Sequence, residues 1–204
     1  MTVINTNDTL RKVIGDKVDA LEAKVIDHID EFAREFMEKA PFLILSTSDA
    51  DGHCDASPKG DAPGFVEIVD DKTILIPDRP GNKLAYGHEN VLANPHVGLL
   101  FMIPGTTETL RINGRAELDA SEPLREQLAA RGKPATLVIR VTVDQCFFHC
   151  SKAFIRSGLW KPDTWAEKPH KVSFGTIYAK KENLPEEAVK ALDDAIEADY
   201  RDNL

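Results

Sequence analysis

The chain has 204 residues, of which 42% are hydrophobic, and its 34 acidic and 25 basic residues give a formal net charge of -9 at pH 7. This length suffices for one domain with a sizeable core, and the acidic balance argues against a nucleic-acid partner. No apolar run approaches the roughly 20 residues that span a bilayer, and three cysteines do not make a disulfide framework. We therefore expect a cytoplasmic protein with no membrane partner.

The first 40 residues are expected to form a helical extension. A short helix is predicted from about Asp8 to Ile14, with Gly15 as its stop. From Val18 to Ala40, apolar residues recur at spacings of three and four, which predicts one amphipathic helix that ends before Pro41.

After Pro41 the pattern becomes typical of β-structure. Phe42–Leu45 is a predicted buried strand and Asp49–Gly52 a predicted tight turn. β-branched residues and partial alternation predict further strands at Gly64–Val69, Thr73–Ile76, Val97–Met102, Thr109–Leu118 and Leu137–Phe148. Helices are predicted at about Asn82–Ala93, Ser121–Arg131 and Pro185–Tyr200. The expected fold class is mainly β with flanking helices (α+β): a small barrel of six or so antiparallel strands.

Two of the predicted turns carry basic and amide side chains. Lys59 lies in the turn Ser57–Asp61, and the turn Ile76–Lys83 contains Arg79 and Asn82 as well as its last residue. Charge-assisted bonds from Lys and Arg are the strong kind, and a guanidinium can grip two oxygens at once. Prolines in the second turn would place these donors before a ligand binds. The pattern predicts a site for one phosphate; the alternative is an ordinary surface loop with solvated charges.

The segment Cys146–Cys150 contains residue types that bind zinc. On a strand, however, Cys146 and His149 would face opposite sides, and no second ligand pair of matching spacing occurs in the sequence. We therefore expect no metal site and assign these thiols to the core. A haem ligand, either His149 or His170, stays open as an alternative without a dedicated motif.

Several segments between Ala40 and Trp160 together resemble one family, the pyridoxamine-5'-phosphate-oxidase-like flavoproteins of the FMN-binding split-barrel fold. The nearest subgroup consists of oxidases whose substrate is unassigned. The segments that carry the resemblance are Phe42–Thr47, Asp55–Asp61, Gly64–Val66, Ile76–Lys83, Asn90–Pro95, Val97–Phe101, Glu108–Ala116 and Cys150–Ser157.

The resemblance implies that FMN is the cofactor and that the protein is a homodimer with FMN at the subunit interface. The residues that would line the flavin ring and ribityl chain are Ala56, Ser57, Pro58, Lys59, Ile76, Pro77, Thr109 and Arg111. Those that would bind the phosphate are Arg79, Asn82 and Lys83. Those expected from the second chain are Lys152, Arg156 and Trp160. No catalytic residue is implied, because flavin redox chemistry does not require a protein nucleophile.

Three segments are therefore expected: a helical extension (1–40), an FMN-binding split-barrel core (41–160), and a C-terminal loop and helix (161–204) that packs on the core or on the partner subunit. The expected function is an FMN-dependent oxidoreductase that uses a small-molecule electron donor or acceptor. The alternative is a non-catalytic flavin- or haem-binding module for storage or sensing. Relatives that oxidise pyridoxamine phosphate end in an Arg-Leu-x-Pro segment that is absent from the last residues here, 197–204, so the substrate stays unassigned.

Overall fold

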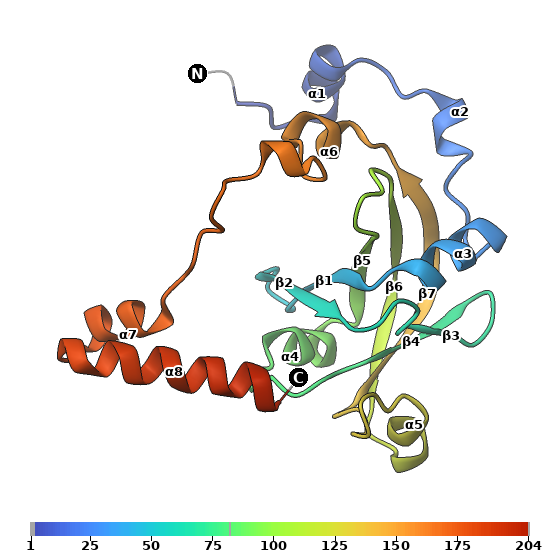
Figure 1. Ribbon diagram of the computed structural model, residues 1–204. Coiled ribbons are helices and arrows are strands. Elements are labelled where there is room, and N and C mark those ends of the chain that lie inside the picture. The colour runs from blue at the N-terminus through green and yellow to red at the C-terminus, as the bar shows by residue number, and fades with distance from the viewer. Residues whose placement is uncertain (1–2, 82, 204) are drawn as a thin grey trace.

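The computed structural model describes residues 3–81 and 83–203. Its centre is one seven-stranded antiparallel sheet with the strand order β2-β1-β5-β6-β7-β4-β3, curved into an open barrel with helices at its ends (Figure 1). The strands are β1 (Phe42–Ser48), β2 (Cys54–Gly60), β3 (Glu67–Ile68), β4 (Thr73–Pro77), β5 (His96–Met102), β6 (Thr109–Asp119) and β7 (Val138–His149). The predicted class, a split β-barrel of the α+β type, is confirmed.

Eight α-helices and one short 3-10 helix surround the sheet in the described part of the chain. They are α1 (Asn7–Ile14), α2 (Asp19–Glu22), α3 (Glu31–Lys39), α4 (Tyr86–Ala93), α5 (Glu122–Gln127), α6 (Lys152–Ser157), η1 (Pro162–Thr164), α7 (Phe174–Glu182) and α8 (Glu186–Asp202). The N-terminal prediction of α1 is confirmed: Thr6 caps it, and Gly15 ends it with a φ of 86°. Within the described ranges, none of these helices has the length and hydropathy needed to cross a membrane.

The core lies on the concave side of the sheet, because alternate side chains of each strand point inward. In β1, Leu43 and Leu45 are almost fully buried, while Phe42 and Ile44 are half-buried and Ser46 is exposed. The same alternation recurs in β5 and β6. The inward set from these strands includes Val97, Leu99, Phe101, Leu110 and Ile112.

The two longest strands, β6 and β7, connect the halves of the barrel. Their pairing shifts register between Asn113 and Gly114. At Gly114 the backbones approach so closely that an added Cβ would lie 2.1 Å from the carbonyl oxygen of Thr142. A bulge of this kind increases the local twist of a sheet, which allows β7 to pair with β6 along its whole length and with β4 at one end.

The prediction of one helix from Val18 to Ala40 is wrong. The segment forms α2 and α3, separated by residues 23–30. Between them, the backbone of Ile26 exchanges two hydrogen bonds with that of Cys146 (3.1 and 2.7 Å). These bonds pair backbone groups in the part of β7 that lies beyond its pairing with β4. Asp30 then starts α3 by accepting a hydrogen bond from the backbone N–H of Ala33 (2.8 Å). Tertiary pairing and a new N-cap therefore overrode the periodic pattern.

Three other predicted elements differ in extent. The strand predicted at Gly64–Val69 is reduced to β3, and α4 begins at Tyr86 instead of near residue 82. The helix predicted at Ser121–Arg131 ends at Gln127. The C-terminal segment holds α7 in addition to the predicted helix.

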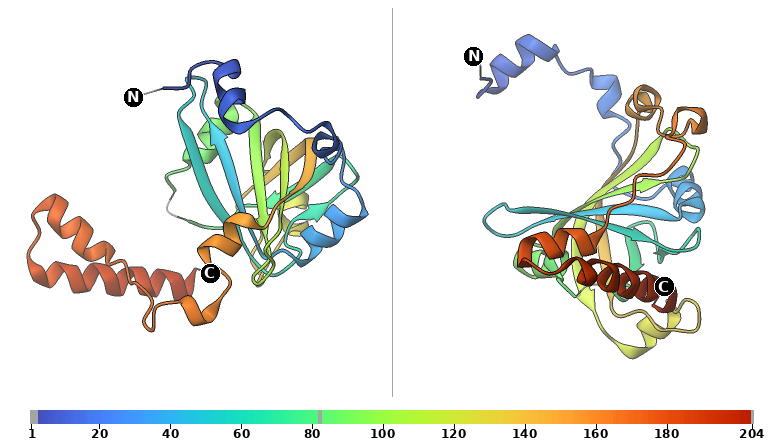
Figure 2. Two further views of the ribbon diagram at one scale, coloured as in Figure 1. Left: turned by 90° about the horizontal axis from the view of Figure 1, so that it is seen from above. Right: turned by 60° about the vertical axis from the view of Figure 1, so that its left-hand side comes forward.

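The C-terminal helices α7 and α8 pack mainly on each other. Gly175 of α7 lies so close to α8 that an added Cβ would be 2.2 Å from the carbonyl oxygen of Val189. Figures 1 and 2 show this helical pair projecting beside the barrel, joined to α6 by an extended segment. One hydrogen bond, from Lys133 Nζ to the carbonyl of Asp202 (3.2 Å), connects the end of α8 to the barrel.

Candidate functional site

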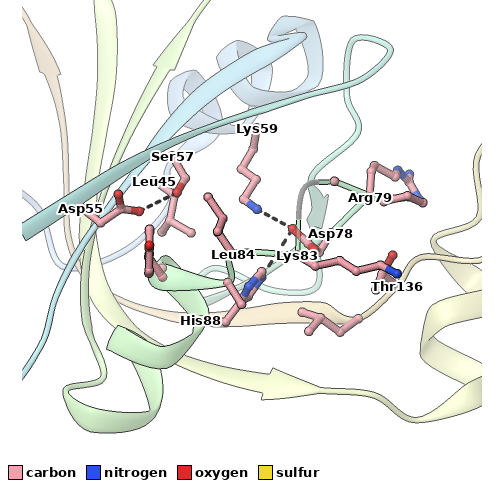
Figure 3. Close-up of a pocket in the computed structure, with 16 residues that line it drawn as sticks. Leu45, Asp55, Ser57, Lys59, Asp78, Arg79, Lys83, Leu84, His88 and Thr136 are labelled. Carbon is pink, nitrogen blue, oxygen red and sulfur yellow. Dashed lines mark hydrogen bonds and ion pairs between the residues drawn. The ribbon is translucent and has the colours of Figure 1, made fainter. Parts of the chain in front are cut away.

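A cavity of about 630 Å³ opens where the curved sheet brings β2 close to the segment that follows β4. Because β2 is one edge of the sheet and β4 lies next to the other edge, the cavity occupies the seam of the barrel (Figure 3). Its walls come from β1, β2, residues 78–81 and 83–88, and residues 136–137. This volume is within the range of about 300–1,000 Å³ that small-molecule sites occupy.

One ion pair joins the two sides of the cavity. Lys59 of β2 contacts the carboxylate of Asp78, which follows β4, and both side chains are largely buried (16% and 11% exposed). The Asp78 backbone is held in place because its N–H donates to Leu137 and its carbonyl accepts from Thr136 (both 2.9 Å). His88 of α4 approaches the same carboxylate oxygen with Nε2 at 3.5 Å.

The ionisation of Asp78 depends on these neighbours. Burial opposes the charged form, but the 3.5 Å approach of His88 and the hydrogen bond and charge of Lys59 outweigh it, so the pKa of Asp78 lies below its usual 3.8. The carboxylate is therefore ionised at neutral pH and is shared by two basic groups.

A second ion pair lies beside the first. Nε of Arg79 donates to Asp61 (2.8 Å), and Nη1 of Arg79 donates to the carbonyl of Leu128 (2.8 Å). Arg131 also contacts Asp61, at 3.2 Å. Two of the five N–H groups of the Arg79 guanidinium, one on Nε and one on Nη1, are thus engaged by the protein, and the remaining N–H groups on Nη1 and Nη2 could meet a ligand without rearrangement.

The loop between Arg79 and α4 is held in an unusual backbone conformation. Lys83 and Ala85 have φ values of 60° and 56°, a left-handed region that costs free energy for residues other than glycine. Figure 3 shows the Lys83 side chain extending along the cavity toward Thr136. Lys83 makes no ion pair with any other residue in the described part of the chain, so its ammonium group is available to a ligand.

Helix α4 forms the remaining wall and lies close against β1 and β2. A Cβ added at Gly87 would be 3.4 Å from both Asp55 and Ser57, so a small residue is required there. The hydroxyl of Ser57 donates to Asp55 (2.7 Å). Since both line the cavity, they supply a polar rim opposite the Arg79 loop.

The predicted site residues fall into separate groups. Ser57, Lys59, Arg79 and Lys83 line the cavity together. Asn82 lies outside the described residues. The other candidates on the strands do not line this cavity in one chain; they are Ala56, Pro58, Ile76, Pro77, Thr109 and Arg111.

Burial and side-chain direction explain these separate positions. On β2 the exposed residues Ala56 and Pro58 alternate with half-buried Ser57 and Lys59, so they occupy the other face. Ile76 belongs to the core, with no exposed surface. Thr109 is buried, and Arg111 stacks over the ring of Phe147 at 5.4 Å.

The three residues expected from a second chain lie on α6 and just after it. Lys152 and Arg156 are exposed, and Trp160 stacks on Phe154 with ring centroids 5.8 Å apart. None of the three lines the cavity of its own chain. Figure 1 places α6 at the end of the barrel opposite α4.

Sequence reasoning missed Asp61, Asp78 and His88 as parts of the site. The two aspartates lie inside the motifs that contain the basic residues. An acidic residue next to a predicted anion site was a signal that it would form an ion pair with one of the basic residues. His88 offered no such signal, because its position depends on how α4 is oriented.

A further group of possible metal ligands lies at the turn between β1 and β2. Ligand atoms of Asp49, Asp51 and His53 all lie within 4.8 Å of one another. Their hydrogen bonds are those of the turn itself: Asp49 accepts from the N–H groups of Asp51 and His53 and contacts the His53 ring at 2.8 Å. These bonds belong to the turn, and none of them involves the Asp51 carboxylate. Of the two thiols that were assigned to the core, Cys146 is buried, but Cys150 is exposed because it follows the end of β7, so that assignment is wrong for Cys150.

The comparisons with known proteins identify the family. The family model for pyridoxamine 5'-phosphate oxidase matches residues 29–150, which is more than half of the chain. The chain therefore belongs to this family, as the sequence motifs predicted. No curated protein matched the sequence.

Solved structures of similar fold come from several bacteria. HupZ from Group A Streptococcus is 18% identical over 59% of this chain and 93% of its own, with a TM-score of 0.48. General stress protein 26 from Bacillus anthracis is 12% identical over 56% and 88%, with a TM-score of 0.45. An FMN-binding protein from Syntrophomonas wolfei is 13% identical over 70% and 96%, with a TM-score of 0.44. These likenesses concern the fold alone.

Proposed function

We propose that the protein binds FMN in the cavity at the barrel seam and acts as an FMN-dependent oxidoreductase. The observation that carries the proposal is the convergence of Lys59, Arg79 and Lys83 from separate segments on one cavity, in a chain of the pyridoxamine 5'-phosphate oxidase family. An acidic protein has no general attraction for polyanions. Lys59 and Arg79 are paired with Asp78 and Asp61, so the ammonium group of Lys83, which has no ion pair within the described residues, favours a single bound anion.

The residues present fit the chemical parts of FMN. Lys83 and the remaining N–H groups of Arg79 would bind the phosphate, since Lys83 has no ion-pair partner within the described segments and the two hydrogen bonds of Arg79 hold its guanidinium in place. Leu45 and Leu137 offer apolar surface for a ring. The hydroxyl of Ser57 would bond to a polar edge. Asp61 lowers the local positive charge, so the phosphate contact depends most on Lys83.

FMN, when bound, supplies the electron-accepting ring of the reaction. The protein's part is to orient the bound molecule and to set the charge around it. Lys59 was expected to act on the ring directly. Its ion pair with Asp78 instead favours a role in closing the seam and holding that carboxylate in place.

We propose a homodimer in which α6 of one chain completes the cavity of the other. Lys152, Arg156 and Trp160 are far from the cavity of their own chain, and exposed apolar residues remain on this segment, among them Ile155 (55% exposed) and Trp165 (57%). Large exposed apolar groups of this kind mark interaction surfaces. In the same proposal the chain has three segments: a helical extension (1–40), the barrel core (41–160), and a C-terminal loop and helical segment (161–204).

The test is FMN binding by wild-type protein and by the double variant Arg79→Ala with Lys83→Ala. Each charge-assisted contact is worth about 1.5–3 kcal/mol. The double variant should therefore bind FMN at least about 100-fold more weakly, with its far-UV circular dichroism unchanged. Arg11→Ala with Lys12→Ala makes the same charge change on α1, outside the cavity, and should bind as the wild type does. Equal FMN affinity in all three proteins would refute this placement of the phosphate.

A non-catalytic binding module for flavin or haem would use the same cavity. Anaerobic addition of NADH and of NADPH to the FMN complex separates the two functions. Bleaching of the flavin absorbance supports the oxidoreductase, whereas a bound flavin that neither nucleotide reduces supports the module. Failure to bind FMN at all would contradict both the cofactor and the site.

A further inference from the structure

The cavity contains a titratable cluster that the proposed FMN contacts do not use. His88, Asp78 and Lys59 come from α4, from the segment after β4 and from β2, and they meet at one carboxylate oxygen. Figure 3 shows the ring of His88 and the ammonium group of Lys59 both turned toward Asp78. Nε2 of His88 is buried and makes no hydrogen bond of normal length within the described residues, so its 3.5 Å approach to Asp78 is its main polar interaction.

We propose that His88, positioned by Asp78, is the group that exchanges a proton with the molecule bound in this cavity. This inference rests on the proposed function, because it assigns a role at the same site. Histidine is the side chain whose charge ordinarily changes between pH 5 and 8. A carboxylate that faces one ring nitrogen fixes the tautomer and leaves the other nitrogen to exchange protons. Here Nε2 faces Asp78, so the exchanging atom is Nδ1.

The His88 ring lies beside an ionised carboxylate. Lys59 and Asp78 form a neutral pair, and an imidazolium beside them would still face that carboxylate. The pKa of Asp78 lies below its usual value because, although burial opposes ionisation, the neighbouring His88 and Lys59 favour it; Asp78 is therefore an anion at neutral pH. His88 would take up a proton when negative charge develops on the bound ring. The titratable and charged groups that line the cavity with it are Asp55, Lys59, Asp78, Arg79, Lys83 and Tyr86.

The fixed geometry distinguishes His88 from another Asp–His pair in this chain. Asp49 and His53 lie 2.8 Å apart at the turn between β1 and β2, but the side chain of His53 is 81% exposed. The side chain of His88 is 21% exposed and belongs to the cavity wall. His53 is therefore a matched control: it has the same chemistry without a ligand site.

The experiment measures the reduction potential of bound FMN against pH, from pH 5 to 8.5, by dye-coupled spectroscopic titration. Four proteins are compared at saturating FMN: the wild type, His88→Gln, Asp78→Asn and His53→Gln. Glutamine keeps an N–H toward Asp78 but cannot exchange protons. The slope of the reduction potential against pH reports how many protons are taken up per electron. If His88 exchanges a proton on reduction, the wild-type slope should change within this pH range by the amount that corresponds to one proton per two electrons.

The expected result is that His88→Gln loses this change of slope, while His53→Gln keeps it. Asp78→Asn should move it to lower pH, because the nearby opposite charge that favours the charged ring has been removed. Superimposable curves for the wild type and His88→Gln, with FMN bound to both, would overturn the inference. A wild type that binds no FMN would instead overturn the proposed function, so the two failures are distinguishable.

A measurement without flavin tests the positioning directly. Nitrogen-15 spectra of the neutral imidazole rings report which nitrogen carries the proton. In the wild type the His88 proton should reside on Nε2, facing Asp78, and this preference should weaken in Asp78→Asn. A ring protonated on Nδ1 in the wild type would contradict the assigned geometry even if the potential curves agreed.

Discussion

The ion pair between Lys59 and Asp78 should contribute to the stability of the barrel because it connects the two sides of the seam. The perturbation is Lys59→Met, which keeps most of the volume of the side chain but removes its charge. Asp78 is then left as a largely buried carboxylate, with the His88 ring at 3.5 Å as its remaining basic neighbour. Removing one partner of a buried pair costs about 3–5 kcal/mol. Since the cavity admits water, we expect the lower end, about 3 kcal/mol.

A double-mutant cycle isolates the pair from the other effects of each substitution. Asp78→Asn alone leaves Lys59 without its partner, and the combined variant Lys59→Met with Asp78→Asn leaves no unpaired charge in the seam. Neighbouring groups that share an interaction show coupling energies of about 0.5–3 kcal/mol, and this buried contact should lie near 2. The double variant should therefore be more stable than the sum of the single losses predicts.

The assay is urea unfolding followed by far-UV circular dichroism. Tryptophan fluorescence is unsuitable because both tryptophans, Trp160 and Trp165, lie after β7 and α6 and outside the barrel. An unchanged m-value with a lower midpoint shows that stability, and not the surface exposed on unfolding, has changed. A coupling energy below about 0.3 kcal/mol would refute the argument that this ion pair closes the barrel.

The same pair sets an acid limit on stability. Because the pKa of Asp78 is lower in the folded protein than its usual 3.8, its ionisation stabilises the fold above that value. This contribution is lost as the pH falls through the folded-state pKa. In Lys59→Met the loss of stability on acidification should be smaller, and an identical acid dependence in the two proteins would contradict the assignment.

Two further predictions concern other parts of the fold. Burial, with a smaller effect from a nearby carboxylate, raises the pKa of the Cys146 thiol to about 11. A thiol reagent at pH 8 should therefore modify the exposed Cys54 and Cys150 and leave Cys146 unmodified until urea is added. Rapid reaction of all three thiols would contradict the burial of Cys146. Gly114→Ala should lower the free energy of unfolding by about 2–3 kcal/mol, because the new Cβ meets the Thr142 backbone at the register shift; an unchanged urea midpoint would show that the strands can separate there without cost.

The sheet was predictable because its strands carry local signals that agree with the tertiary structure. Val97–Met102 and Thr109–Leu118 were each located within about one residue of β5 and β6. The failure at Val18–Ala40 has the opposite cause. Its spacing is helical, but Ile26 bonds to the free edge of β7, and a strand edge over 100 residues away in the sequence leaves no trace in a local window.

The candidate site was predictable only in part. The motifs predicted Lys59, Arg79 and Lys83 on turns. The prediction is wrong for Lys59, which lies on strand β2 and pairs with Leu43 of β1, but the three residues do line one cavity. The sequence did not show that Asp61 and Asp78 would lie against two of these cations. Which charged residues become neighbours across the cavity depends on the curvature of the sheet, and the sequence pattern of a single strand does not determine that curvature.

The arrangement of the two aspartates explains how an acidic chain can keep a basic cavity folded before any ligand binds. Unpaired buried cations would be costly, and Asp61 and Asp78 neutralise Arg79 and Lys59 within the seam. Lys83, held outside these pairs by a left-handed backbone, retains its charge for the ligand. The basic residues that the sequence motifs assigned to one phosphate site therefore fall into two groups in the structure. In the proposed function, Lys59 and Arg79 would mainly close the barrel, and Lys83 and His88 would face the bound molecule.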